Sequence, residues 1–538
     1  MSIKQTATFL TWTFIYFLAA ILLQHISGAY NADFAGNPDS PANHVTSIMI
    51  SQYLRGGSWQ SPMNFAEQYY IHYPQVAIGH WPPFFYLCAG IWGLILGVGH
   101  ASYLMFMALI VAVLAALLRV VLSHELGVWW SGLAGLLLLL LPPIRETSEL
   151  MMLDTMVALM SLLAGCALVY LFSNPTLISA ILFGLFTSCA ILTKGTGMAL
   201  VMAPLVMIVL TRNVNIIRTK VFWLPALIVA AVAGPWTILF MSSAKQGWEY
   251  HVGWKYTLAA IKGFCFLLVD AIGPVLFIAA AYGIWVGIFR RRTIVWSMLF
   301  ALLISTYMFI IIVPSSIGQR YLTAAFPPLV GFAMAGIASV AKSLQKAKWS
   351  NIAQIGVVGM IVAGGVMVMR KPRPIAPTGF NMVAEYVIDK YSNYPKVAIL
   401  VCSDGIGEGA MISGLAAREP KPGSYFVLRG SKQLARSLWS GQNYHVTFSD
   451  EESVKKYLES LPVTIIITDQ NVGAKPLKHV EQVESVMTSG KSMWHLDSTW
   501  NLPERKIKLY SINQNNYQPP TNISVDMESM LGRNLKAQ

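Results

Sequence analysis

The sequence TFLTWTFIYFLAAILLQHIS at residues 8–27 is followed closely by the polar stretch NADFAGNPDSP at residues 31–41. The first stretch is apolar and long enough to cross a bilayer, which takes about 20 such residues. The second opens a long segment that is rich in Trp, Tyr, His and Pro and runs into His80-Trp81-Pro82-Pro83. Simple connectors between membrane spans are short and polar. Carboxylates and aromatic rings gathered at the membrane border therefore predict a functional site there.

The composition describes a membrane protein. The chain has 538 residues, of which 55% are hydrophobic and only 12% charged, and its mean hydropathy is +0.54. Soluble globular proteins carry about 25% charged residues. A net charge of +13 would suggest a nucleic-acid partner in a soluble protein. Here the basic residues lie largely in short loops between apolar runs, where they set orientation, so we expect no nucleic-acid partner.

The apolar runs predict the number of spans. Runs suitable for crossing a membrane lie near residues 8–27, 101–121, 127–143, 153–172, 176–193, 197–211, 222–242, 264–289, 293–313, 321–341 and 352–369. Residues 82–99 are the ambiguous case, because counting them adds one more span. We read this run, which begins with Pro82-Pro83, as a helix at the outer interface. Its alternative is a full crossing, with a shorter run such as 197–211 not spanning.

Charge parity supports the interfacial reading. Basic residues gather at 212–220, 290–292 and 342–348, and Lys4 precedes the first span. Positively charged loops stay in the cytoplasm, and all four groups agree only if an even number of spans separates residues 4 and 212. The outer side then carries residues 28–100, 144–153, 194–196, 243–263, 314–320 and the region after about 370. We expect one outward-facing site built from these segments.

The composition changes after the basic, proline-rich residues 370–374. Strand-like runs at 397–401, 425–428 and 463–468 alternate with helical patterns at 408–418 and 451–461. This alternation predicts a small soluble α/β domain. We set the domains at 1–371 for the membrane part, 372–515 for an extracytoplasmic α/β domain and 516–538 for a flexible tail. The glycine-rich residues 405–409 favour a tight strand-to-helix turn over a phosphate cradle, because Glu408 opposes an anion.

Five short motifs follow one another along the chain. They are PD at 38–39, WPPFFY at 81–86, LDTM at 153–156, LTKG at 192–195 and RYL at 320–322, the last followed by Pro327-Pro328. In this order and on one side, they resemble the GT-C superfamily of polyprenyl-phosphate-dependent glycosyltransferases over roughly residues 8 to 340. The most similar members are the family 39 protein mannosyltransferases and the aminoarabinose-transferase-like proteins.

The resemblance implies both a fold and an activity. The fold is an all-α polytopic membrane protein with about 11 transmembrane helices and outer interfacial helices, here with a C-terminal soluble α/β domain. The activity is transfer of a hexosyl or pentosyl group, with inversion, from a polyprenyl-phosphate donor to a lipid, glycan or protein acceptor. We expect a multi-pass protein of the cell membrane, in bacteria the inner membrane, acting at the extracytoplasmic face.

The resemblance also assigns roles to residues. Asp39 matches the acid taken as the general base or acceptor-orienting group, and Asp154 matches the acid of the second outer loop. Lys194 matches the lysine that holds the donor phosphate, and Arg320 lies where a late basic residue reaches the same phosphate. His251 is a further candidate for phosphate or sugar binding. The candidates for lining the substrate are His44, His80, Trp81 and Tyr86.

The chain departs from the family pattern in places that leave the sugar and the acceptor open. The usual Asp-Glu pair is Asp39-Ser40 here. The basic residue expected three positions later is Ala42, and His44 is the nearest substitute. His80-Trp81 replaces the usual charged residue before the two prolines.

Each candidate also has a structural interpretation. Asp39 and Asp154 are placed to cap the helices that follow them. Lys194 can be an interface lysine whose stem crosses apolar surface, and Arg320 can owe its place to position alone. His251 can serve packing, and the aromatic residues can form an ordinary interfacial belt. Asp33, Asp39 and His44 match no strong metal motif, so no cofactor is assigned, although a divalent metal ion stays open.

Two other classes of function compete with an enzyme. A transporter or flippase of lipid-linked sugars needs polar residues along its spans and often internal repeats, and no clear repeat is visible. A membrane scaffold that only presents the C-terminal domain would not need Asp39, Asp154 and Lys194 on one side.

Overall fold

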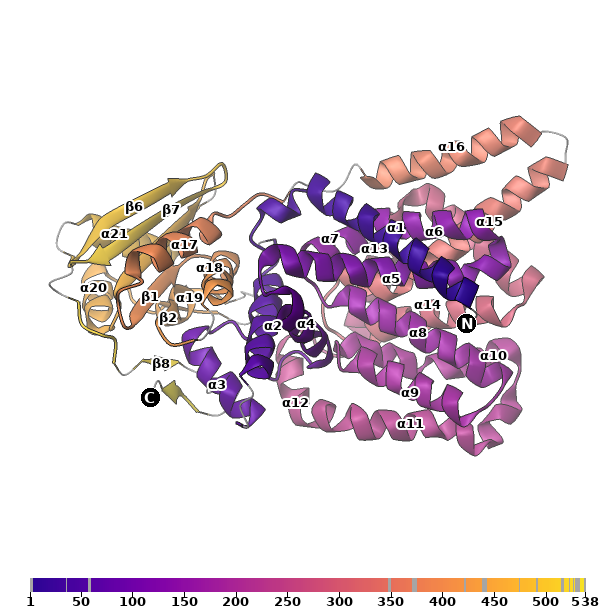
Figure 1. Cartoon of the computed structure of the whole chain (residues 1–538), viewed down its shortest axis with the longest axis horizontal. Coiled ribbons are helices and arrows are strands. Elements are labelled where there is room, and N and C mark those ends of the chain that lie inside the picture. Colours follow the sequence, from indigo (N-terminus) through magenta and orange to yellow (C-terminus); the bar gives the residue numbers. More distant parts are fainter. Residues whose placement is uncertain are drawn as a thin grey trace. The chain divides into compact units, whose positions relative to one another are not determined.

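The computed structural model describes residues 3–34, 36–56, 60–346, 350–369, 375–419, 422–437, 443–473, 475–489, 492–513, 517–521, 523–525, 527 and 533–536. The chain forms two compact units, and each is assembled from separate stretches of sequence (Figure 1). The first unit comprises residues 1–27, 81–85 and 105–373, and the second comprises residues 28–80, 86–104 and 374–538.

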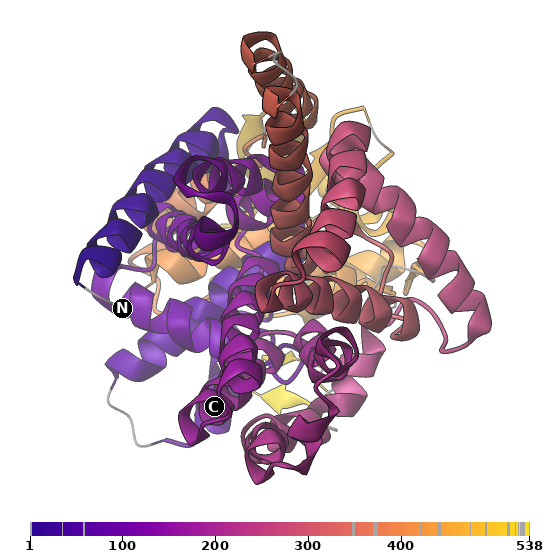
Figure 2. The same cartoon turned by 90° about the vertical axis from the view of Figure 1, so that its right-hand side faces the viewer.

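The first unit is a bundle of helices that lie side by side (Figure 2). Its elements are α1 (Ile3–Ile26), α5 (His100–Leu126, whose first turn belongs to the second unit), α6 (Val128–Leu140), α7 (Pro142–Glu149), α8 (Asp154–Ser173), α9 (Leu177–Ile191), η2 (Gly195–Val201), α10 (Ala203–Thr211), η3 (Val214–Arg218), α11 (Lys220–Val232), α12 (Gly234–Gln246), α13 (Trp254–Trp285), η4 (Val286–Arg291), α14 (Ile294–Ile312), η5 (Gln319–Ala325), α15 (Phe326–Lys346) and α16 (Ser350–Met369). Within it, α8 packs along α9 and α13 packs along α15.

The described helices make this a multi-pass membrane protein. Six are long and apolar enough to cross a membrane, and the number rises to 8 if each of two bent pairs is one span. The bent pairs are α6 with α7, at 60°, and α11 with α12, at 57°. The sequence count of about 11 included these pairs and shorter apolar helices such as α9 as spans.

The ambiguous run at 82–99 folds as the short helix α4 (Phe84–Leu96). Its 13 residues measure about 20 Å along the axis, whereas the hydrocarbon core is about 30 Å thick. A helix of this length suits the predicted interfacial position. The competing run at 197–211 is also short, because η2 and α10 together cover only Gly195–Thr211. Both helices are short, so their lengths do not decide which of the two runs crosses the membrane. The topology derived from the basic loops therefore stays a prediction.

The second unit joins the first outer segment to the C-terminal region. The outer segment contributes η1 (Ala29–Asn31), α2 (Asp39–Arg55), α3 (Pro62–His72) and α4 from Tyr86 onward. The C-terminal region contributes α17 (Phe380–Tyr391), β1 (Val397–Cys402), α18 (Gly405–Arg418), β2 (Tyr425–Arg429), α19 (Gly430–Gln433), β3 (Ala435–Arg436), β4 (His445–Val446), α20 (Glu451–Ser460), β5 (Ile465–Asn471), α21 (Lys478–Thr488), β6 (Trp494–Asn501), β7 (Arg505–Ile512), β8 (Ser524–Val525) and β9 (Leu535–Lys536).

A five-stranded mixed sheet organises the C-terminal region, with strand order β2-β1-β5-β7-β6. The strands β2, β1 and β5 are parallel, whereas β7 and β6 add in antiparallel fashion. The three parallel strands and the helices α18 and α20 confirm the α/β prediction. Every residue of β1 is buried, which is why it reads as a continuous apolar run.

The outer segment and the C-terminal region share one packed interior. The His72 ring stacks on the Phe426 ring with centroids 4.1 Å apart, and His72 Nδ1 lies 2.9 Å from the Tyr425 carbonyl oxygen. Ile71 of α3 belongs to the same buried cluster as the strands, and so do Ile523 and Leu535 of the predicted tail. Asp33 accepts hydrogen bonds from Thr378 and Asn381 in the residues around the start of α17.

Candidate functional site

A buried ion pair marks the candidate site in the first unit. Asp154 is the first residue of α8, and Lys194 directly precedes η2. The Lys194 Nζ atom lies 2.8 Å from Asp154 Oδ1, and the two residues are only 4% and 3% exposed. Two buried charges persist only when they are paired, because each alone would have to give up its hydration. The structure thus brings together two residues that the sequence proposed separately.

Aromatic rings surround the ammonium group. Lys194 Nζ lies 5.4 Å from the centre of the Trp81 ring and 4.8 Å from that of the Tyr321 ring. Ring faces attract cations at such distances. Trp81 is held nearby because the Phe84 backbone N–H donates to the Leu192 carbonyl oxygen over 2.8 Å. Four of the five motifs therefore meet around one charged side chain.

Arg320 adds a second cation to this group. Its guanidinium carbon lies 5.3 Å from the centre of the Tyr321 ring, whose other neighbour is Lys194. Glu146 of α7 interacts electrostatically with both Arg320 and Asp154. Asp154 Oδ2 is buried and has no hydrogen-bond partner among the described residues. The cluster therefore contains two cations, two carboxylates and one carboxylate oxygen available to a further donor.

Tyr321 and Glu146 were not among the predicted site residues. Tyr321 had a signal, because it directly follows Arg320 in the RYL motif. Glu146 lies in a predicted outer segment, but only the fold shows that it interacts electrostatically with Arg320 and Asp154.

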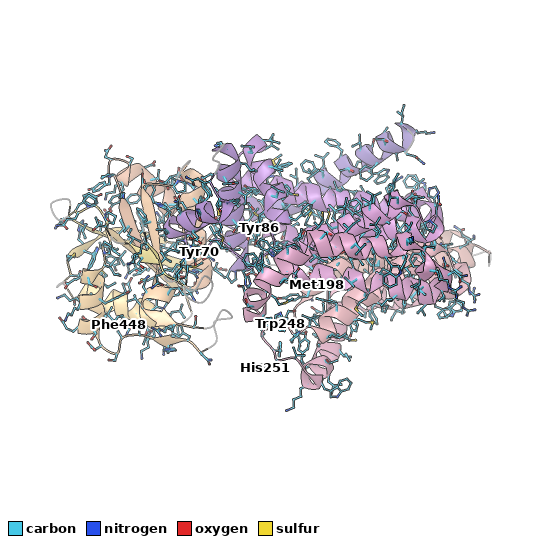
Figure 3. The ribbon with its side chains drawn as sticks, turned by 90° about the horizontal axis from the view of Figure 1, so that it is seen from below. Tyr70, Tyr86, Met198, Trp248, His251 and Phe448 are labelled. Atoms are coloured by element: carbon cyan, nitrogen blue, oxygen red, sulfur yellow. The ribbon has the colours of Figure 1, made fainter. Side chains whose placement is uncertain are left out.

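His251 lies in the connection between α12 and α13, together with Trp248 (Figure 3). This connection is tied to the segment before η5, because the Glu249 N–H donates to the Ser315 carbonyl oxygen over 2.8 Å. Lys245 lies 5.8 Å from the centre of the Trp248 ring. The His251 side chain is exposed. Its part in phosphate binding stays a prediction.

Asp39 belongs to the second unit, where it is the first residue of α2. Its backbone N–H donates to Asn37 Oδ1 over 3.0 Å, and its side chain is half-buried. Pro38 holds the N-cap position, and no side chain caps the helix. Asp39 is therefore an acidic residue in the first turn of α2 rather than its N-cap, and whether it serves only to stabilise the helix stays open. For Asp154 the capping interpretation is wrong, because Leu153 is the N-cap of α8 and the Asp154 carboxylate binds Lys194 instead.

Tyr86 and His80 also lie in the second unit and are buried (Figure 3 labels Tyr86). The Tyr86 hydroxyl donates to Asn43 Oδ1 of α2 over 2.7 Å and interacts electrostatically with Asp39. Asp39, Asn43 and Tyr86 thus form one polar group at the start of α2.

His44 is a buried anchor of α2. Its Nδ1 lies 2.5 Å from Ser413 Oγ, and its Nε2 lies 3.0 Å from the Val98 carbonyl oxygen. Burial disfavours the imidazolium form and lowers the pKa of His44 to about 4. The ring is therefore neutral at neutral pH and does not supply the missing basic residue. A substrate-lining role for His44, as for His80, Trp81 and Tyr86, stays a prediction.

The proposed metal ligands do not fit a metal ion. The Asp33 carboxylate is used by Thr378 and Asn381, and both ring nitrogens of His44 have protein partners. Within the part of the chain that the structure describes, no group of three or more His, Cys, Asp or Glu side chains is arranged to hold a metal ion. We therefore derive no step through a metal.

The predicted site residues fall into two groups. Trp81, Asp154, Lys194, Arg320 and His251 belong to the first unit, and Asp39, His44, His80 and Tyr86 belong to the second. In the first unit Lys194 contacts both the Asp154 carboxylate and the Trp81 ring. That Asp39 joins them in one pocket stays a prediction.

No protein-family model and no curated protein matches the chain. Several solved structures are similar to the chain. ArnT from Cupriavidus metallidurans bound to undecaprenyl phosphate is 14% identical, with a TM-score of 0.56, over 93% of this chain and 98% of ArnT. The oligosaccharyltransferase of Archaeoglobus fulgidus in its apo form is 13% identical, with a TM-score of 0.53, over 85% of this chain and 69% of that protein. The chain thus has the membrane fold of these two proteins over most of its length.

Proposed function

We propose that the protein is an integral-membrane glycosyltransferase that uses a polyprenyl-phosphate-linked sugar as donor. The observation that carries this proposal is the buried pair of Lys194 and Asp154, flanked by Trp81, Tyr321 and Arg320, in a fold shared with a transferase that binds undecaprenyl phosphate. An anionic lipid headgroup at this place meets two cations, Lys194 and Arg320, whose charge is partly offset by Asp154 and Glu146.

The proposed chemistry is a direct displacement at the anomeric carbon. The bond between the sugar C1 and the phosphate oxygen breaks, and its electron pair stays on the polyprenyl phosphate. Lys194 and Arg320 stabilise the negative charge that develops there. The acceptor oxygen or nitrogen forms the new bond to C1 from the opposite face, which inverts the configuration, and its proton passes to Asp39 as general base.

Asp154 has a different task in this proposal. With Oδ1 bound to Lys194, it holds the ammonium group in place before the donor arrives. A lysine side chain has about 2 kcal/mol of rotamer entropy to lose, and fixing it in advance lowers the cost of binding the phosphate. The free Oδ2 can accept a hydrogen bond from a sugar hydroxyl.

The comparison with a transporter or flippase favours the enzyme. A transporter places ionisable groups along its spans to form a path. The Asp154 and Lys194 pair lies instead at the beginning of α8 and the end of α9, which are helix termini.

Donor turnover tests the proposal. The purified protein in lipid nanodiscs, given undecaprenyl-phosphate-linked pentoses or hexoses and an extract of envelope lipids and glycans, should release undecaprenyl phosphate in equal amount to the glycosylated acceptor. Mass spectrometry measures both products. Movement of intact donor across a liposome membrane, without release of undecaprenyl phosphate, would instead establish a flippase.

The C-terminal region is proposed to lie outside the cell membrane. Its support is the shared interior with the first outer segment, since one packed core cannot be split by a bilayer. In this proposal residues 1–371 carry the donor chemistry, residues 372–515 form the extracytoplasmic domain and residues 516–538 its tail.

Reporter fusions test the predicted topology. Alkaline phosphatase is active only outside the cytoplasm, so we expect it to be inactive after residue 215 and active after residue 375. A fluorescent protein that matures only inside the cell should give the opposite pattern. Phosphatase activity after residue 215 would refute the charge parity from which the sidedness was derived.

A further inference from the structure

We propose that the C-terminal α/β domain positions Asp39 for the reaction, through the contact of its helix α18 with α2, and that Gly409 and Ser413 are positioning residues. This inference rests on the proposed function, because it assigns Asp39 to the reacting acceptor. It gives the soluble domain a task in the chemical step.

Three contacts join α2 to α18 along one face. Pro41 of α2 lies against Gly409, where an added Cβ would come within 2.7 Å of the proline ring. His44 is hydrogen-bonded to Ser413, and Gln52 Nε2 donates to the Glu419 carbonyl oxygen over 3.1 Å. The partner positions rise together along both helices, so the helices run in the same direction. The first of these contacts lies two residues from Asp39.

The sheet holds α18 rigidly at its first turn. Asp404 caps the helix, accepting hydrogen bonds from the backbone N–H groups of Ile406 and Gly407 over 3.1 and 2.7 Å. Arg505 of β7 then binds Asp404 over 3.0 Å and also binds Asp469 of β5. The residue that caps α18 is therefore tied to β7 and, through Arg505, to β5, the strand next to β1.

A second buried group fixes α18 one turn later. Glu408 is fully buried and binds Arg429 at the end of β2 over 2.8 Å. It also accepts hydrogen bonds from the Ser431 N–H and hydroxyl over 2.7 and 2.6 Å. A buried carboxylate with several charge-assisted bonds gives a strong directional restraint. Gly409, which contacts α2, is the next residue.

The opposite side of α2 is held as well. Asn43 accepts the hydrogen bond from Tyr86, and Thr46 Oγ1 accepts one from the Ala77 N–H over 3.0 Å. His44 Nε2 lies within hydrogen-bond distance, 3.0 Å, of the Val98 carbonyl oxygen. The first two turns of α2 are thus held by α18 on one side and by Ala77 and Tyr86 on the other. Asp39 lies at their N-terminal end.

Such a clamp matters because proton transfer requires exact placement of the base. An error of about 1 Å in a reacting group costs on the order of 10²-fold in rate. Moving Pro41 away from α18 should turn α2 about its other contacts and displace Asp39 without removing it. The expected signature is a lower kcat with an unchanged KM for the donor, whose phosphate is bound by residues of the first unit.

Two glycines on α18 provide a matched pair for the test. Gly409→Ala places a methyl group against Pro41, whereas Gly414→Ala places one 3.1 Å from Ala384 and Asn381 in α17, away from α2. Both variants crowd the same helix, so both should lower the melting temperature. We expect kcat to fall about 10- to 100-fold in Gly409→Ala and less than threefold in Gly414→Ala. Equal losses of kcat in both variants would overturn the proposal.

A double-variant cycle separates positioning from general damage. Ser413→Ala removes the hydroxyl that binds His44 and should lower kcat, whereas Ser413→Thr, which keeps the hydroxyl, should retain it. In the Asp39→Asn background Ser413→Ala should have no further effect, because residues that act through one group are not additive. An undiminished loss in that background would show that Ser413 does not act through Asp39.

Hydrogen exchange distinguishes failure of this inference from failure of the proposed function. Amides of residues 40–50 should exchange faster in Gly409→Ala than in Gly414→Ala, whatever reaction the protein catalyses. If the unaltered protein transfers no sugar but this difference is seen, the clamp stands and the glycosyltransferase proposal falls. If transfer is observed and exchange in α2 is the same in both variants, the clamp is refuted.

Discussion

Asp39→Asn is expected to lower kcat for sugar transfer by about 10²- to 10⁴-fold, the usual contribution of a general base. Asparagine has nearly the same shape, and the Asp39 backbone contact with Asn37 does not involve the carboxylate. The change therefore removes the ability to accept a proton while keeping the shape of the side chain. Initial rates at saturating donor, measured by release of undecaprenyl phosphate, give kcat directly, and the donor KM should stay within about twofold.

Glu67→Gln is the matched control for that experiment. Glu67 lies on α3 in the same outer segment, and its carboxylate, on a side chain that is 14% exposed, binds the 61% exposed Arg533 over 2.6 Å. Ion pairs with one exposed partner contribute about 1 kcal/mol or less, so this variant should keep kcat and lose little melting temperature. An unchanged kcat in Asp39→Asn would reduce Asp39 to a structural residue and leave the proposed mechanism without its base.

Lys194→Met should damage both stability and catalysis. Removing the cation leaves Asp154 buried without a partner, which typically costs about 3–5 kcal/mol. It also removes the group that stabilises the developing phosphate charge, which typically costs about 10²- to 10³-fold in kcat. The melting temperature of the purified protein and its initial rates measure the two losses separately.

Combining Lys194→Met with Asp154→Asn separates the two roles. With no charge left to bury, the double variant should regain most of the lost melting temperature. Its kcat should stay as low as that of Lys194→Met, because the phosphate still lacks its cation. Recovery of activity together with stability would mean that Lys194 serves only to neutralise Asp154. Lys245→Met, which changes a cation near the Trp248 ring, is expected to have little effect on either measurement.

Local patterns in the sequence predicted a large part of the fold. Apolar runs gave the membrane helices, and the buried strand β1 was visible as five consecutive apolar residues at 397–401. The strands β6 and β7 and the helix α21 were missed. Half of β6 faces solvent, and its sequence WHLDSTWN mixes polar and aromatic residues without a clear alternation. Its strand structure depends on pairing with β7, which no local pattern records.

The site was predictable only as a set of parts. Asp154 and Lys194 were placed on the same side by charge parity, but their ion pair depends on how α8 and α9 pack. The partners of His44 could not be anticipated, because Ser413 lies 369 positions further along the chain. A serine or glycine within a helix carries no sign of its distant neighbour. Contacts of this range are set by tertiary packing alone.

The order of synthesis gives the second unit a particular history. Residues 28–80 emerge from the ribosome early, whereas the strands that cover them begin near residue 397. At the usual elongation rates of about 5–20 residues per second, the interval lasts roughly 15 to 60 s. During that time α2 has no α18 to rest on. A nascent or prematurely terminated chain would thus contain Asp39 without the contact between α2 and α18. Under the proposed clamp, full transfer activity therefore requires that α18 and its sheet have been synthesised.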